Sequence, residues 1–201
     1  MSGQEAGGLG PLLEGPLLDA ARRLLGRRLH STVEGRACEV VITEVEAYGG
    51  CDDPASHAYR GRTARNASMF GPPGTLYVYR SYGIHWCANV VIGAEGDPGA
   101  VLLRAGTPVL GEAVMRRRRG REDHLADGPG KLAQALGVTG ACDGASVLDG
   151  PVRVVGEPPP DVTVVAGPRI GVSRAAERPW RFVMATPVNS PPQWGRVRSR
   201  G

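Results

Sequence analysis

The sequence predicts a single α+β domain. Its 201 residues suit one domain, and a hydrophobic fraction of 41% is enough to build a core. The strand-like segments lie mainly in hairpins, and few strand–helix–strand units occur, which disfavours a doubly wound sheet. No internal repeat is present.

The chain divides into a central domain and two tails. Residues 1–13 are rich in glycine, so we predict a flexible N-terminal tail. The domain is expected over 14–187, and residues 188–201 are predicted to form a flexible, basic C-terminal tail. Inside the domain, leucine and alanine recur at helical spacing from Pro16, which suits the first turn of a helix, up to Gly26.

Residues 39–48 are rich in valine, isoleucine and threonine and predict a strand. Strict alternation divides its side chains between two faces. One face would carry Val41, Thr43, Val45 and Ala47. The other would carry Glu44, Glu46 and Tyr48.

The segment 49–73 has little periodicity, and an ordered loop of this length is usually functional. Two strands, 75–80 and 84–92, follow as a hairpin joined near Ser81-Tyr82-Gly83. The remaining elements are predicted as a strand at 100–105, helices at 111–121 and from 128 to 136, and strands at 147–155, 161–165 and 181–184.

Composition limits the class of protein. The net charge of +4 is compatible with a polyanionic partner. Of the 24 basic residues, only Lys131 is a lysine. The four cysteines form no Cys-x-x-Cys pair or zinc spacing, so we expect a reduced intracellular protein without a metal or other cofactor. We see no secretory signal and no stretch apolar enough to cross a membrane, so a cytoplasmic protein is expected.

Two groups of residues carry candidate chemistry. Glu44 and Glu46 share one strand face, which is either an ordinary solvated face or a site, because a buried charge is costly without a partner. Three of the five tyrosines, Tyr77, Tyr79 and Tyr82, fall within six residues. They either pack in strands, as tyrosine commonly does, or form a surface on which bases stack.

Several linked motifs appear together and in order. They are Glu-Val-Glu-Ala-Tyr at 44–48, Ser56-His57, Met69-Phe70, Pro-Gly-Thr-Leu-Tyr-Val-Tyr at 73–79, Tyr82-Gly83, Cys-Ala-Asn at 87–89, Val-Leu-Leu-Arg-Ala at 101–105, Gly-Pro-Gly-Lys-Leu at 128–132 and Pro-Arg-Ile-Gly-Val at 168–172. In these motifs the chain resembles the alkyladenine (3-methyladenine) DNA glycosylase family over residues 14–187. The resemblance implies a curved, mixed or antiparallel sheet with a protruding β-hairpin, surrounded by helices, similar to the C-terminal domain of methionyl-tRNA formyltransferase.

The resemblance also implies roles at matching positions. Glu46 would be the general base that activates water, and Arg104 would assist at that water and at the phosphate of the flipped nucleotide. Tyr48, His57 and Tyr79 would form the walls around the extruded purine. Asn89 would disfavour the exocyclic amine of guanine, and Tyr82 would be the wedge that enters the gap in the duplex.

The implied activity is a monofunctional, base-flipping glycosylase of base-excision repair. It would hydrolyse the N-glycosidic bond of an alkylated purine such as 3-methyladenine, or of hypoxanthine or ethenoadenine, and leave an abasic site. The implied partner is double-stranded DNA containing a damaged purine. The protein would act as a monomer in the cytoplasm, associated with the nucleoid. A lyase would need an amine, and the chain offers only Lys131 and its N-terminus.

The DNA contacts near the wedge are less defined. Ile84 and His85 stand where vertebrate members carry other bulky groups. Lys131, after Gly-Pro-Gly, suits either a phosphate contact or an ordinary start of a helix. The run Arg116–Arg119 is interpreted as a solvated helix face, because acidic residues flank it.

Two other functions are compatible with parts of the sequence. A catalytically silent nucleic-acid-binding module could share this fold, but it would not need both Glu46 and Arg104. A hydrolase of free nucleosides would have no use for a wedge at Tyr82.

Overall fold

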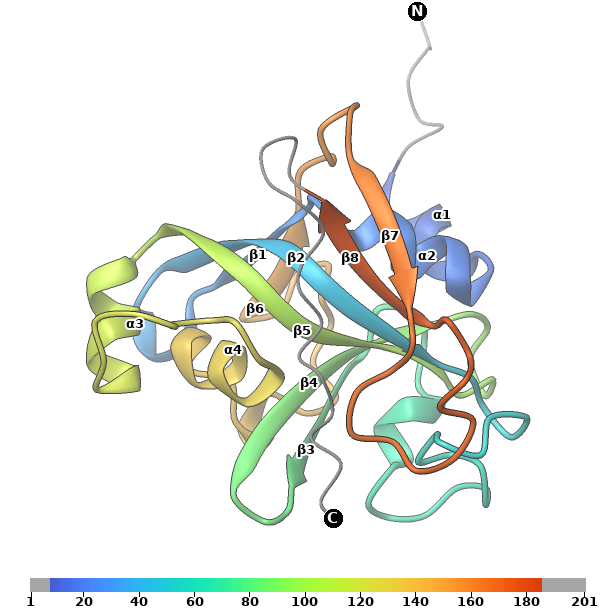
Figure 1. Cartoon of the computed structure of the whole chain (residues 1–201). Coiled ribbons are helices and arrows are strands. Elements are labelled where there is room, and N and C mark those ends of the chain that lie inside the picture. The colour runs from blue at the N-terminus through green and yellow to red at the C-terminus, as the bar shows by residue number, and fades with distance from the viewer. Residues whose placement is uncertain (1–7, 186–201) are drawn as a thin grey trace, which may run out of the picture.

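Strand β2 (Cys38–Tyr48) is the centre of the sheet, because three strands pair with it. Strand β5 (Gly99–Leu110) runs along one edge of β2, whereas the other edge is shared by β1 (Arg28–Ser31) and β8 (Arg181–Ala185). Figure 1 shows this arrangement in the computed structural model, which describes residues 8–185.

The sheet continues outward from these strands. Beyond β5 lie β4 (His85–Ile92) and β3 (Leu76–Ser81), beyond β1 lies β6 (Val152–Val155), and β7 (Thr163–Gly167) pairs with β8. All the paired strands are antiparallel, and the sheet curls into a half-barrel. The predicted α+β single domain is confirmed.

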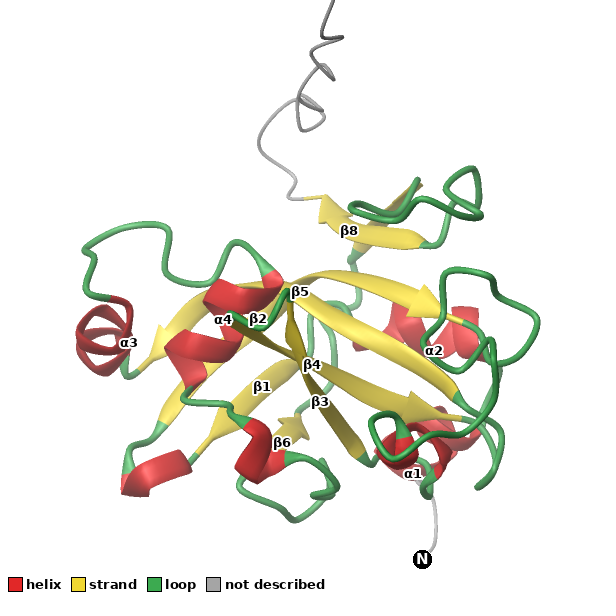
Figure 2. Ribbon diagram, turned by 90° about the horizontal axis from the view of Figure 1, so that it is seen from below, coloured by secondary structure: helices red, strands yellow, loops and turns green. Residues whose placement is uncertain are grey.

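The helices bury leucine, alanine and methionine side chains in one large core. They are α1 (Leu9–Glu14), α2 (Leu17–Leu24), α3 (Glu112–Arg119) and α4 (Pro129–Leu136). Figure 2 shows α4 lying against β4 and β5, which it contacts. Three short 3-10 turns complete the secondary structure: Val33–Gly35, Ala67–Phe70 and Gly140–Cys142.

The two faces of β3, β4 and β5 have different surroundings. Alternate side chains on one face enter the large core: Leu76, Val78, Ala88, Val90, Val101 and Leu103. The residues between them line a cavity on the opposite face: Tyr77, Tyr79, Cys87, Asn89, Leu102 and Arg104. Strand alternation therefore makes a core and a pocket from the same three strands.

The predicted alternation along β2 is wrong for its first half. Val40 and Ile42, not Val41 and Thr43, are fully buried there, whereas Val45 and Ala47 enter the core as expected. The pairing with β5 shifts register on both sides of Glu44. This bulge inserts an extra residue and reverses the direction of the following side chains.

Other boundaries also differ from the prediction. Residues 9–14 form α1 and bury Leu12 and Leu13, so they are part of the domain rather than of a flexible tail. The short strand β1 was not predicted. The helix after Pro16, the 81–83 hairpin and both later helices are confirmed, whereas β5 extends beyond 105 and β6 begins only at Val152. The predicted tail at 188–201 lies outside the described residues.

None of the helices in residues 8–185 has both the length and the apolar character that crossing a membrane requires.

Candidate active site

A cavity of about 650 Å³ lies between the second face of the sheet and two connecting segments. The floor comes from β3, β4 and β5, one wall from residues 54–69, and the opposite wall from residues 170–174. This volume falls within the roughly 300–1,000 Å³ that is typical of small-molecule sites.

Glu46 lies beneath this cavity with no exposed surface. Three donors contact its carboxylate: the Tyr48 hydroxyl at 2.8 Å and the Arg104 Nη1 at 3.2 Å, both on Oε2, and the Ile170 backbone N–H at 2.7 Å on Oε1. They come from β2, β5 and the connection between β7 and β8. A buried charge needs such partners. Because a carboxylate offers about four acceptor positions, one remains for a further donor.

Arg104 connects both glutamates of β2. Its Nε donates to Glu44 Oε1 at 2.9 Å, while its Nη1 reaches Glu46. Burial lowers the pKa of Arg104, but the carboxylates of Glu46 and Glu44 outweigh this effect and hold the pKa above its usual value. The guanidinium therefore stays charged at the edge of the cavity.

Tyr48 remains a neutral donor. Burial, followed by the adjacent Glu46 carboxylate, raises the pKa of its phenol far above the ordinary range. On its ring lies the guanidinium of Arg169, 4.8 Å from the ring centroid.

Arg169 forms a fully buried ion pair with Asp53. The two contacts are 2.5 Å and 2.9 Å long and use both carboxylate oxygens. Arg169 also donates to the carbonyls of Ala47 and Ala175, and Asp53 accepts from the N–H of Gly49 and Ala55. The pair thus joins the end of β2 and both connecting segments that wall the cavity.

An aromatic cluster lines the other side of the cavity. The His57 and Tyr79 rings are 4.5 Å apart in a T-shaped contact, and Tyr77 stacks on Tyr79 at 5.5 Å. The Tyr77 hydroxyl lies 2.9 Å from His57 Nδ1. Burial and, to a smaller degree, Arg65 lower the pKa of His57, so the imidazole is neutral at pH 7.

A sequence model described as methylpurine-DNA glycosylase matches residues 12–187. This chain belongs to the methylpurine-DNA glycosylase family. The family predicted from the motifs is therefore confirmed.

Bacterial relatives align over most of their length. A protein of Rhodopseudomonas palustris strain HaA2 is 50% identical over 196 residues, covering 90% of this chain and 91% of the relative. A Frankia casuarinae protein is 51% identical, covering 85% of each chain, and one from Mycolicibacterium paratuberculosis is 51% identical, covering 82% of each. All three carry the provisional name 3-methyladenine DNA glycosylase.

In this member of the methylpurine-DNA glycosylase family, the residue predicted as the general base and those predicted as pocket walls all lie at the cavity. Tyr48, His57, Tyr79 and Arg104 line the cavity, and Glu46 lies directly behind Tyr48 and Arg104. Asn89 lines it too, with its amide nitrogen donating to the Tyr77 carbonyl at 3.1 Å.

The hairpin residues project from the molecule beside the cavity. Tyr82 is 90% exposed and Ile84 68%. Tyr82 and Gly83 have φ angles of +49° and +69°, and the Ile84 N–H closes the turn on the Ser81 carbonyl at 3.0 Å. Two central residues with positive φ are typical of the tight turns that favour hairpins. A non-glycine residue with positive φ is uncommon and worth a functional explanation.

Lys131, a candidate phosphate contact, and Arg118 of the run Arg116–Arg119 are already paired within the protein. The Lys131 ammonium lies 2.9 Å from Asp127 Oδ1. In the run Arg116–Arg119, Arg118 donates to the carbonyls of Val33 and Ala135 and so joins α3 to neighbouring elements. The interpretation of this run as a solvated face is wrong for Arg118, which is largely buried.

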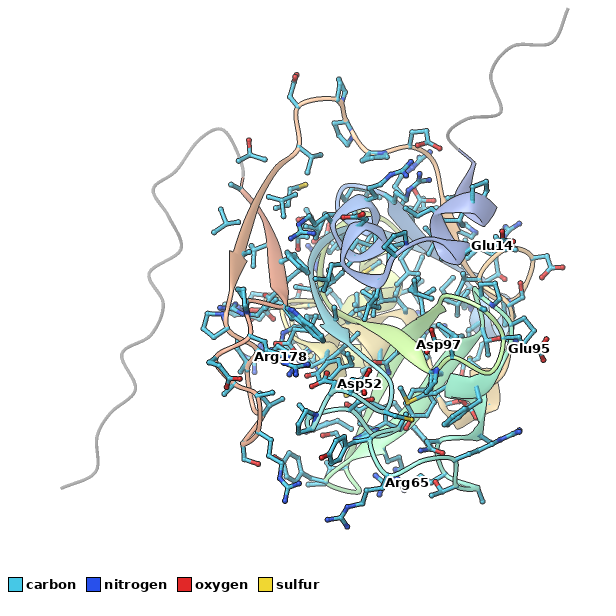
Figure 3. The ribbon with its side chains drawn as sticks, turned by 90° about the vertical axis from the view of Figure 1, so that its right-hand side faces the viewer. Glu14, Asp52, Arg65, Glu95, Asp97 and Arg178 are labelled. Atoms are coloured by element: carbon cyan, nitrogen blue, oxygen red, sulfur yellow. The ribbon has the colours of Figure 1, made fainter. Side chains whose placement is uncertain are left out.

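The arginines at the mouth of the cavity differ from Arg104 and Arg118 in their partners. Arg60, Arg65 and Arg174 line its mouth, and none has an acidic partner among residues 8–185. Arg65 donates to the Arg80 carbonyl at the hairpin, and Figure 3 shows Arg65 at the outer edge of the molecule.

The sequence grouped Tyr77 with Tyr79 and Tyr82 as a possible stacking surface but did not assign it to the pocket wall. That assignment could have been made, because Tyr77 lies two residues before Tyr79 on the same strand and therefore shares its face. Ile170 acts through its backbone, and the pairing of Asp53 with Arg169 spans 116 residues, so neither has a local signal. No group of three or more His, Cys, Asp or Glu side chains within the described part of the chain is arranged to hold a metal ion.

We predict that Asp53→Asn destabilises the protein in a pH-dependent way. Removing one partner of a buried pair costs about 3–5 kcal/mol at pH 7. Although burial opposes it, the hydrogen bond from Arg169 keeps the pKa of Asp53 below its ordinary value. The stabilisation by the ionised group is therefore complete above the unfolded pKa of about 3.9 and is lost as the pH falls through the folded pKa.

Urea unfolding between pH 7 and 3 would measure this effect. The difference in unfolding free energy between wild type and Asp53→Asn should shrink below about pH 4, given that ordinary pKa. Asp52→Asn, which changes the exposed neighbour shown in Figure 3, is the matched control. A difference that does not change with pH would show that the charge of Asp53 is unimportant.

Proposed function

We propose that the cavity receives a damaged purine flipped out of duplex DNA and that Glu46 supports hydrolysis of its N-glycosidic bond. One observation carries the proposal: a fully buried carboxylate accepts hydrogen bonds from three donors beneath an aromatic pocket, at the base of an exposed hairpin. A base inside a duplex must be extruded before its sugar bond can be reached.

The reaction balances as a hydrolysis. Water attacks C1′ of the deoxyribose and gives its proton to the Glu46 carboxylate, while the C1′–N bond breaks and its electron pair leaves with the base. The developing positive charge on the sugar is stabilised by the same carboxylate. Arg104 and the Ile170 N–H hold that carboxylate in place, and the free acceptor position on Glu46 takes the water.

The pocket favours a base that is already cationic. Burial raises the pKa of Tyr77 to about 12 and that of Tyr79 still further, and it lowers the pKa of His57. None of these three wall residues is therefore poised to protonate a neutral base near pH 7. An N-alkylated purine such as 3-methyladenine carries its own positive charge, which aromatic faces also attract. Hypoxanthine and ethenoadenine, being neutral, should be slower substrates.

The contacts with DNA follow from exposure and charge. We propose that Tyr82 enters the gap left by the flipped nucleotide, with Ile84 and His85 beside it. Arg60, Arg65 and Arg174 would contact the phosphate backbone, because these side chains lack carboxylate partners among the described residues. Lys131 could join them only by exchanging Asp127 for phosphate.

The other functions have less support. A silent binding module on the formyltransferase-like fold would gain nothing from a buried Glu46 held by Arg104. A nucleoside hydrolase would not need an apolar hairpin tip. A lyase reaction is disfavoured, because Lys131 is the only lysine and its ammonium is paired with Asp127 outside the cavity lining.

We predict that Glu46→Gln preserves folding and lesion binding but lowers the rate of base release by about 10²–10⁴-fold, the usual contribution of general-base catalysis. Single-turnover release should be measured on methylated duplex DNA and on duplexes carrying hypoxanthine or ethenoadenine. Glu39→Gln is the control, since Glu39 lies on the same strand but pairs with Arg28 and His30 away from the cavity. Near wild-type excision of a neutral lesion by Glu46→Gln would exclude Glu46 as the base.

We predict that Tyr82→Ser weakens excision most where extrusion is hardest. Flipping costs a few kcal/mol of stacking and pairing, and an inserted ring offsets part of that cost. The loss should be largest in a matched duplex and smallest opposite a mismatch or in a single strand. Because Tyr82 is 90% exposed, the melting temperature should barely change.

The effect is measured by the rate at which Tyr82→Ser excises one lesion in these three contexts. The control is the same measurement on Val109→Ser, which changes an exposed residue of β5. Equal losses in all contexts would exclude a wedge, and a large fall in melting temperature would indicate a packing role.

A further inference from the structure

Glu44 is the second carboxylate on the site face of β2, and the mechanism above does not use it. Its side chain is 21% exposed and does not line the cavity. One oxygen, Oε1, accepts from Arg104 Nε at 2.9 Å and from Arg181 Nη1 at 3.2 Å. Glu44 therefore binds two arginines without facing the place where a base would lie.

The contact with Glu44 restrains the planar guanidinium of Arg104. A guanidinium presents its donors in a rigid fork. With Nε on Glu44 and Nη1 on Glu46, the plane is fixed at two points. Its Nη2 has no hydrogen-bond partner among residues 8–185 and remains available at the cavity, which Arg104 lines.

The contact with Arg181 reaches the opposite wall. Arg181 Nε donates to the Pro168 carbonyl at 2.8 Å, two residues before the Ile170 N–H that binds Glu46. The contacts thus form a closed ring from Glu46 through Arg104, Glu44, Arg181 and the 168–170 segment, and back to Glu46. Two of the three donors to Glu46 belong to this ring.

We propose that Glu44 is a positioning residue, whose carboxylate holds Arg104 and, through Arg181, the 168–170 segment against Glu46. The position of Glu44 in a β-bulge fits this role, because the register shift in the pairing of β2 with β5 brings it beside Arg104. The inference rests on the proposed function of Glu46.

Glu44 also contributes a negative charge close to Glu46, and this charge should affect the pH dependence of the reaction. The groups that face it or its partners are Glu44 and Tyr48 on β2, Tyr79 on β3, Arg104 on β5, Arg181 on β8, and Arg169 in the connection before β8. Neutralising Glu44 removes the nearby negative charge from this set. Removing a like charge favours the ionised form of a neighbouring carboxylate, so the acidic limb of the pH–rate profile should move to lower pH.

The test compares Glu44→Ala and Glu44→Gln in the full chain. Small misplacements of catalytic groups can cost up to about 10²-fold in rate, so Glu44→Ala should lower single-turnover base release by about 10- to 100-fold, with unchanged affinity for lesion duplex. Glu44→Gln retains an oxygen acceptor for Arg104 and should lose less rate, but it should shift the acidic limb downward. Glu39→Ala and Glu39→Gln are the matched controls on the same strand.

The outcomes separate the two proposals. A folded Glu44→Ala variant with the wild-type rate would overturn the proposed role of Glu44, and so would Glu44→Gln with the wild-type rate and an unshifted pH–rate profile. Neither result would affect the proposal about Glu46. If the Glu44 variants lose rate, affinity for DNA and melting temperature together, and their pH–rate profile does not shift, Glu44 is merely a structural residue. Absence of base release by wild type and by the Glu39 variants would instead overturn the proposed function, and this inference with it.

Discussion

The site depends on one constraint, which is that a carboxylate with no exposed surface needs hydrogen-bond donors within the protein. Glu46 meets it by taking donors from its own strand, from β5 and from the connection before β8. Each donor must therefore be held in place, and the buried pair of Asp53 with Arg169 does this for the third. Buried ion pairs add little net stability compared with apolar packing. Their value here is that they fix the geometry of the pocket.

The curled sheet explains why a pocket and a core can share the same strands. Helices cover one face, whereas two irregular connections cover the other and leave the cavity between them. The aromatic rings of β3 stand on a rigid floor, and the hairpin that carries Tyr82 is the direct continuation of that strand. A base in the pocket and a wedge in the duplex would therefore be positioned by one element.

Sequence patterns predicted much of this arrangement, and the exceptions have physical reasons. Residues that share a strand face, such as Glu44, Glu46 and Tyr48, were grouped correctly, but alternation failed before the bulge because one extra residue leaves no mark in the hydrophobic pattern. The strand β1 is only four residues long and was not predicted, because its pairing on both sides, and not a pattern in its own sequence, holds it in place.

Side-chain partners were the least predictable feature. The roles expected for Glu46 and Arg104 came from a family resemblance and stay predictions, and the structure places the two side chains 3.2 Å apart. The partner of Lys131, by contrast, is Asp127 at helical spacing, which local sequence could have indicated. Contacts between distant segments, such as Arg118 with Val33 or Arg169 with Asp53, require the tertiary fold.

The central claim is that the cavity takes a base only after its extrusion from DNA. Chromatographic measurement of free 3-methyladenine, released by the same enzyme from methylated duplex DNA and from the corresponding methylated nucleoside, tests it most directly. We expect enzyme-dependent release from the duplex and none above background from the nucleoside. Equal release from both, or release from the nucleoside alone, would contradict it.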